Sequence, residues 1–245
     1  MSGVPLWTWL IGALFVAALL HGLWQLGQRK TAFRQIAQEL GGSCIENTLT
    51  AQVVVPTAVG KLTLDTFTSW SRGDTPKSTT YTRLRLPLVA LQPFEFTLMS
   101  RTPGTQLLMQ MVQSPLGQLA TVGSTKAQES LHVLRLNEIA LGDSAFDRSF
   151  ILKSPQEMQA KQLFAQVKEH LPKPYEFVLI LQPYSAAASS HRTQTMVLHY
   201  QEKGVATDVA HLRNVCDLLQ HLAQELQRRG IASNEKAQVA SPLAL

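Results

Sequence analysis

The first 28 residues contain no Asp, Glu, Lys or Arg, and His21 is their only ionisable side chain. At 1.5 Å rise per residue, a helix of about 20 apolar residues crosses the roughly 30 Å hydrocarbon core of a bilayer. Trp7 and Trp9 lie near one end of the run and Trp24 near the other, where amphipathic rings favour the headgroup level. The absence of charged side chains, together with the tryptophans at both ends, therefore predicts a transmembrane anchor over residues 1–28.

Two alternatives to this span stay open, a cleaved secretory signal and a buried soluble helix. A signal peptide has a positively charged N-terminal region and a short apolar run. Here the N-terminal region has no charged side chain, and the apolar run from Val4 to Leu26 is longer than that of a normal signal. These features favour a span that is retained in the mature protein.

Basic residues follow the apolar run directly. Because cytoplasmic flanks of spans carry an excess of Lys and Arg, the remaining chain is expected on the cytoplasmic side of the inner membrane, in a single-pass protein. The expected membrane-anchoring residues are Trp7, Trp9, Trp24, Arg29, Lys30 and Arg34.

Signatures of several familiar chemistries are also missing. Cys44 and Cys216 are too few for a disulfide scaffold, and either one disulfide or two thiols fits the count. The sequence has no C-x-x-C or H-x-x-x-H spacing, no glycine-rich phosphate loop and no G-x-S-x-G motif. We therefore expect no cofactor and no metal and designate no catalytic residue, although a triad assembled from distant positions stays open.

The charge that is present is modest. Charged residues make up 16% of the 245-residue chain, and the net charge of +5 lies wholly beyond residue 28. The sequence has no dense Lys/Arg run, so nucleic acid is not an expected partner. The expected partners are the lipid bilayer and an unidentified protein.

The middle of the chain alternates apolar and polar residues. Residues 29–40 have a helical apolar face and end at Gly41-Gly42, after which period-two alternation predicts antiparallel strands over about 43–152. The run YTRLRLPL places Arg83 and Arg85 opposite a face of leucines. The same alternation predicts strands at Leu107–Met111 and Phe146–Leu152.

The last third has clearer boundaries. Ser154-Pro155-Gln156-Glu157 predicts a capping box, followed by a helix with its apolar face from Met158 to Leu171. Strands are expected at 175–183, in a central position, and at 193–200. A final amphipathic helix is expected from Thr207 or Asp208 to Arg229, with Cys216 buried and inert.

These patterns predict an α+β fold, with an N-terminal transmembrane helix, a mainly antiparallel β domain and two C-terminal amphipathic helices. The expected divisions are 1–28 as the transmembrane anchor, 29–42 as a juxtamembrane helix, 43–230 as a soluble domain with a possible subdivision near 142, and 231–245 as a flexible tail.

Several short motifs resemble a known group. The stretch Gly142-Asp143, Phe146-Asp147 and Phe150-Ile151 leading into a capped helix, together with YTRLRLPL, resembles a loose group of uncharacterised, membrane-anchored bacterial proteins. The resemblance implies architecture and location. The group has no established activity, so no functional residue is carried over. From the residues alone, Asp147 is read as pairing with a neighbouring Arg or capping a turn, with a catalytic carboxylate as the alternative.

Three functional hypotheses remain. The first is a membrane-anchored, non-catalytic module that binds a protein or lipid. The alternatives are a hydrolase with a dispersed active site and a scaffold or assembly subunit of a membrane complex. A deep polar pocket with perturbed acids and bases would favour the hydrolase, whereas shallow grooves would favour binding.

Overall fold

The computed structural model describes residues 14, 16–17, 27–28, 30–47, 50–71, 77–113, 132–172, 176–183 and 195–233. These residues form an α+β fold with a mainly antiparallel sheet and several helices, which confirms the predicted fold at that level. None of the helices in these ranges is long and apolar enough to cross a membrane. Most of the predicted span, including Trp7, Trp9 and Trp24, lies outside the described residues, and so does Arg29, which follows it.

Nine described strands form one sheet, in the order β1-β2-β3-β4-β8-β7-β5-β6, with β9 paired to β4. All their pairings are antiparallel. The strands are β1 (Ser43–Glu46), β2 (Ala51–Thr57), β3 (Gly60–Ser71), β4 (Lys77–Ala90), β5 (Phe96–Ser100), β6 (Phe150–Lys153), β7 (Phe177–Pro183), β8 (Thr195–Lys203) and β9 (Ala232–Ser233). The first four strands are a meander, and β7 lies inside the sheet, as its apolar sequence predicts.

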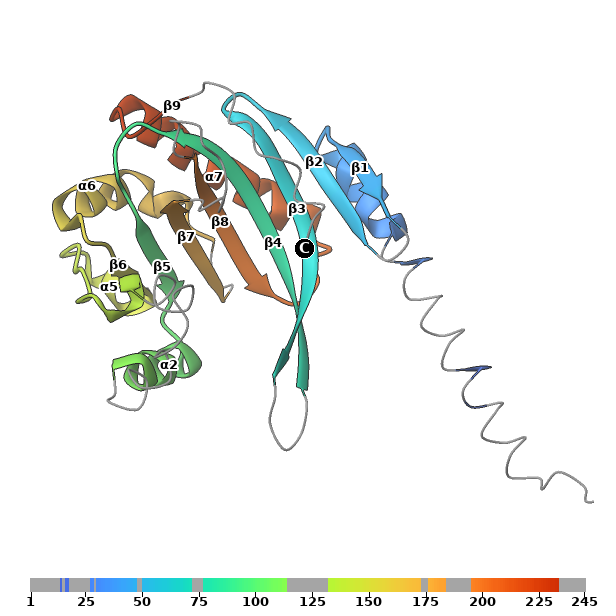
Figure 1. Ribbon diagram of the computed structural model, residues 1–245, viewed down its shortest axis with the longest axis horizontal. Helices are drawn as coiled ribbons and strands as arrows, with labels where there is room; N and C mark the ends of the chain where they lie inside the picture. The colour runs from blue at the N-terminus through green and yellow to red at the C-terminus, as the bar shows by residue number, and fades with distance from the viewer. Residues whose placement is uncertain are drawn as a thin grey trace, which may run out of the picture.

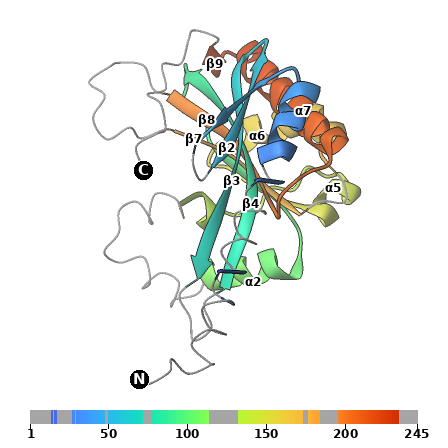
Figure 2. The same ribbon diagram turned by 90° about the vertical axis from the view of Figure 1, so that its right-hand side faces the viewer.

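Helices cover one face of this sheet. They are the helix at residues 30–39, α6 (Glu157–Val167) with the 3-10 turn η1 (Lys168–His170), and α7 (Val209–Arg228). Figures 1 and 2 show these helices on the same side of the strands. The main core lies between the two layers. It includes Leu84 and Leu198 from central strands and Leu219 from α7, all fully buried.

The opposite face, here named the second face, is covered unevenly. Over β5 and β6, Met99 and Ile151 pack with Met109 of α2 (Pro103–Gln113) and with Leu134 of the helical residues 132–135. The buried Lys153 donates from Nζ to the carbonyl oxygens of Leu134 and Leu136, both at 2.7 Å. No helix of the described ranges covers the second face over β3, β4 and β8.

Strong local signals set both ends of α7. The Asp208 carboxylate accepts from the backbone N–H groups of Ala210 and His211 at 3.0 and 3.2 Å, as an N-cap does. Gly230 follows the helix with φ of 67°, in the left-handed region that glycine adopts without a Cβ clash. Ile231 and Ala232, which the sequence pattern placed in a flexible tail, are buried, and Ala232 pairs with Ala90.

One predicted strand is a helix, and another is a helix over its first part. Residues 107–111 belong to α2, where Thr102 and Thr105 exchange side chain–backbone hydrogen bonds at the helix start and Pro103 is the first residue. This capping arrangement and the helix-favouring Leu, Met and Gln residues outweigh a short alternating pattern. Residues 144–149 form α5 (Ser144–Ser149) instead of a strand, because Asp143 caps its first turn. The strand starts only at Phe150.

The predicted capping box at Ser154 is also wrong. Its hydroxyl donates to the carbonyl oxygen of Glu95 at 2.6 Å and accepts from the N–H of Gln156. These contacts tie the chain to the segment before β5, and α6 begins later, at Glu157. Met158, predicted on the apolar face, is 69% exposed. After α5, β6 pairs with β5, so the chain on either side of residue 142 contributes to the same sheet.

Candidate binding face

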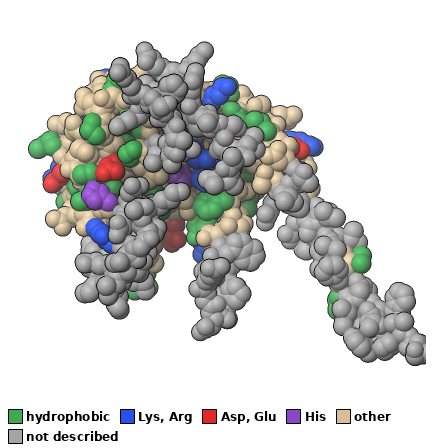
Figure 3. All heavy atoms as spheres, viewed as in Figure 1, with side chains coloured by type: hydrophobic (Ala, Val, Ile, Leu, Met, Phe, Trp, Pro, Cys, Tyr) green, Lys and Arg blue, Asp and Glu red, His purple; other side chains and the backbone are tan. Residues whose placement is uncertain are grey.

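Four polar side chains meet on the second face where β4 and β8 are paired. Arg85 lies opposite His199, and Arg83 lies opposite Gln201. Residues two apart on a strand share a face, and directly paired residues lie side by side. Arg83, Arg85, His199 and Gln201 therefore make a two-by-two group, here named the Arg–His block. Figure 3 shows basic and histidine side chains near the middle of this view.

Asp65 of β3 connects the two arginines. Its carboxylate accepts from Nε and a terminal nitrogen of Arg83 at 2.8 and 2.9 Å, and from a terminal nitrogen of Arg85 at 2.7 Å. The three side chains are 16–27% exposed, so all are half-buried on the sheet. Bidentate pairing of this kind holds a guanidinium in a fixed plane.

Apolar side chains flank the block. Phe67 of β3 and Tyr81 of β4 stack with ring centroids 5.4 Å apart, and the Arg83 guanidinium lies 4.8 Å from the Phe67 ring centroid. On the opposite side, Ile180 of β7 is paired with His199. Arginine and aromatic residues beside apolar contacts are the composition of protein-binding surfaces.

The imidazole of His199 is held neutral. Its pKa is lowered from 6.5 to about 4, mainly by burial and also by the positive charges of Arg83 and Arg85, while Asp65 opposes the shift. At neutral pH, the block therefore carries two guanidinium charges against the one carboxylate of Asp65. The surplus positive charge is half-buried.

A second polar group lies in the main core. The Glu202 carboxylate is 2.7 Å from both the Tyr200 hydroxyl, which donates to it, and Nε2 of His211. All three residues are buried. Thr82 lies nearby in the sheet and links β4 to the chain before α7, since its hydroxyl donates to the Gly204 carbonyl and accepts from Ala206 N–H. These contacts hold the start of α7 against β8.

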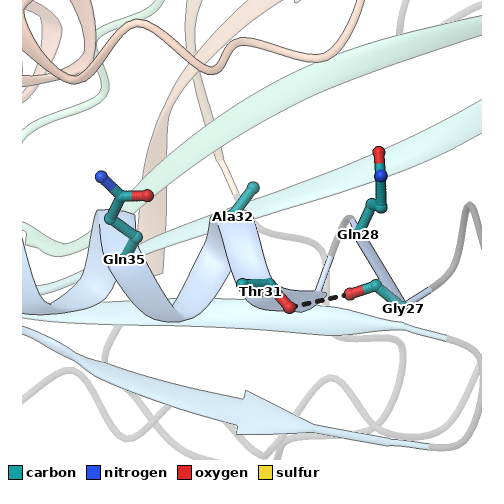
Figure 4. Close-up of a pocket in the computed structure, with 5 residues that line it drawn as sticks. All are labelled: Gly27, Gln28, Thr31, Ala32 and Gln35. Atoms are coloured by element: carbon teal, nitrogen blue, oxygen red, sulfur yellow. Dashed lines mark hydrogen bonds between the residues drawn. The ribbon is translucent and has the colours of Figure 1, made fainter.

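Surface hollows in the described part of the molecule are shallow or small. One of about 530 Å³ lies beside Gly27, Gln28, Thr31, Ala32 and Gln35 (Figure 4). These lining residues belong to one helical segment, and the Thr31 hydroxyl donates to the Gly27 carbonyl at 3.1 Å. Another, of about 110 Å³, lies near Pro93 and Met196 and is below the usual size of a ligand pocket, roughly 300–1,000 Å³.

The residues that the sequence singled out have structural contacts. Asp147 accepts from the backbone N–H groups of Leu141 and Gly142 at 2.9 and 3.1 Å, so it caps the turn before α5. Phe146 and Phe150 pack together with ring centroids 5.2 Å apart, as expected, although Phe146 is helical. Cys44 and Cys216 are free thiols, and burial raises the Cys216 pKa to about 12.

Two of the predicted membrane-anchoring residues, Lys30 and Arg34, lie in the helix at residues 30–39. Arg34 donates to both carboxylate oxygens of Glu46 in β1, and this contact raises the Arg34 pKa. Its side chain is nevertheless 62% exposed. The ion pair joins the helix to the edge of the sheet.

The sequence pattern placed Arg83 and Arg85 on one strand face but did not bring them together with Asp65 and His199. The missing information was register: residues on β4 pair with residues on β8 more than a hundred positions later. Alternation identifies the face of a strand and leaves its partner unspecified. The sequence offered one signal for this binding face, which is two arginines spaced two residues apart on a strand whose other face is apolar.

Comparison with known proteins found no matching family model, no matching curated protein and no matching solved structure.

Proposed function

We propose that this chain is a membrane-anchored, non-catalytic binding module that engages a protein partner through the second face. In this proposal residues 1–28 are a single transmembrane helix in the inner membrane, and the domain that ends in the two amphipathic helices α6 and α7 lies on the cytoplasmic side. The resemblance to membrane-anchored bacterial proteins supports the same architecture.

The observation that carries the proposal is the composition of the second face over β3, β4 and β8. Helices seal the other face of the sheet, whereas here an Arg–His block stands between a stacked aromatic pair and Ile180. Charged groups are normally solvated or fully paired. A half-buried patch with surplus charge and apolar flanks is typical of a surface that a partner completes.

The anchor is tested by washing membranes that contain the full chain with alkaline carbonate. We expect the protein to stay with the membrane pellet, because about 20 apolar residues make insertion effectively irreversible. Release into the supernatant would show that residues 1–28 do not span. Digestion of the domain by an impermeant protease added to intact cells would overturn the cytoplasmic orientation.

The binding face is tested by site-specific photocrosslinking in intact cells. A photoreactive residue at Gln201 reports on the Arg–His block, and one at the exposed Gln224 of α7 is the control on the helical side. We expect a discrete crosslinked product from position 201 and none from position 224. Equal products from both positions, or none from position 201, would contradict the proposed face.

A further inference from the structure

Among the residues that the structure describes, the charge balance of the Arg–His block is incomplete. Asp65 accepts from Arg83 and from Arg85, so two cations share one carboxylate. His199 adds no charge at neutral pH because its pKa is lowered to about 4. A half-buried positive charge without a counter-charge is costly relative to one that is paired. An incoming anionic group would supply the missing charge.

Hydrogen bonding at the block is incomplete as well. Within the described part of the chain, neither Nε of Arg85 nor Nε2 of His199 has a hydrogen-bond partner, although both atoms are shielded from solvent. Buried polar atoms are nearly always satisfied in native proteins. These two residues are directly paired across β4 and β8, so the unsatisfied atoms belong to one place on the sheet.

The spacing of the arginines fits a carboxylate carried on a polypeptide. Arg83 and Arg85 are two residues apart on one strand, which places their Cα atoms about 7 Å apart. A carboxylate that approaches between them meets two planar guanidinium donors. The Phe67–Tyr81 stack and Ile180 then give apolar contacts for neighbouring side chains, which a free inorganic anion would not use.

We propose that the Arg–His block is the recognition site for an acidic side chain in an extended segment of the protein partner. This inference rests on the proposed binding function and gives its chemistry. Arg85 is the central contact, since it lies opposite His199 and makes one described bond to Asp65, whereas Arg83 makes two.

The test follows the His199 imidazole by NMR in the full chain, held in nanodiscs of zwitterionic lipid. The His199 signal is assigned by its loss in His199→Gln. The probe is a capped octapeptide of alternating Glu and Ala, and the neutral control peptide has Gln in place of Glu. We expect saturable shifts of the His199 signal with the acidic probe only, because a carboxylate bound beside the neutral imidazole changes the electrostatic surroundings of the ring.

Two variants give the test its specificity. Arg85→Gln removes the central cation, and we expect it to weaken binding about tenfold or more, the scale of one hydrogen bond to a charged group. Lys161→Glu changes the charge by two in α6, on the other side of the sheet, where Lys161 pairs with Glu157 at 2.9 Å. It should leave binding unchanged. Unaltered spectra outside the block show that each variant is folded.

Four results would overturn the inference. They are equal shifts with the Gln peptide, no shift with either peptide, a response to inorganic phosphate alone, and a response only when anionic lipid is added to the nanodiscs. The last would make the block a lipid site. If crosslinking from position 201 succeeds while the acidic probe fails, the binding function stands and only its proposed chemistry is wrong.

Discussion

At the scale of single residues, the ionisation of His199 links the stability of the fold to pH. Its pKa is near 6.5 in an unfolded chain and about 4 in the folded one. Between these two pH values the unfolded state binds more protons than the folded state. The contribution of neutral His199 to the free energy of unfolding is therefore complete above pH 6.5 and is lost as the pH falls toward 4. Acidification therefore lowers the free energy of unfolding by protonating this imidazole.

We expect wild type to lose up to about 2 kcal/mol more than His199→Gln between pH 7 and pH 5, as the shift implies. Urea unfolding of both proteins at the two pH values measures this difference, and the other titrating groups cancel in the comparison. Parallel losses in the two proteins would mean that His199 titrates normally in the folded state.

The two cysteine thiols differ in their burial. Cys44 is half-buried, whereas Cys216 is 4% exposed with a pKa raised to about 12. Because the thiolate is the reacting form, we expect one thiol per chain to react with a maleimide under native conditions and two in denaturant. Cys44→Ser should abolish the native labelling, and labelling that persists in it would place Cys216 within reach of solvent.

At the scale of elements, α7 depends on its N-cap. Asp208→Ala leaves the N–H groups of Ala210 and His211 without their acceptor, and we expect the free energy of unfolding to fall by about 1 kcal/mol. Asp208→Asn keeps an oxygen acceptor and should retain most of the stability. Thermal unfolding of both variants makes the comparison; equal losses would assign the effect to charge instead of capping.

The elements also show what the sequence could and could not predict. Long patterns with clear ends, such as the apolar face of α7 between Asp208 and Gly230, were predicted within a residue or two. Short apolar runs were not, because alternation over five residues at 107–111 fits a helix and a strand equally well. The Thr102-Pro103 start of α2 was the signal that decides between them.

The candidate site lay beyond the reach of pattern reasoning for a different reason. Arg83 and Arg85 were assigned to the correct face of their strand, but His199 arrives from β8 through a long-range pairing. Strand register across such a separation depends on the whole packed core. The same holds for Glu202 and His211, whose contact requires α7 to lie on β8.

At the scale of the whole molecule, stability depends on the layer between the sheet and α7. Leu219 is fully buried there, whereas Leu107 of α2 is 53% exposed. We expect Leu219→Ala to lower the free energy of unfolding by about 2–5 kcal/mol and Leu107→Ala to change it by less than about 0.5 kcal/mol. Denaturant unfolding monitored by circular dichroism tests both. Similar losses would show that α2 is as important to the core as α7.

The position of β4 has a consequence for how the chain acquires its structure. During synthesis, β3 and β4 close as a local hairpin, but the other edge of β4 waits until β8, more than a hundred residues later, has been made. Non-local pairing of this kind is slow, and an unpaired strand edge can join the wrong chain in the meantime. The meander is therefore the part of the nascent protein that a chaperone would protect, and the pairing of β9 with β4 can follow only after α7 has been made.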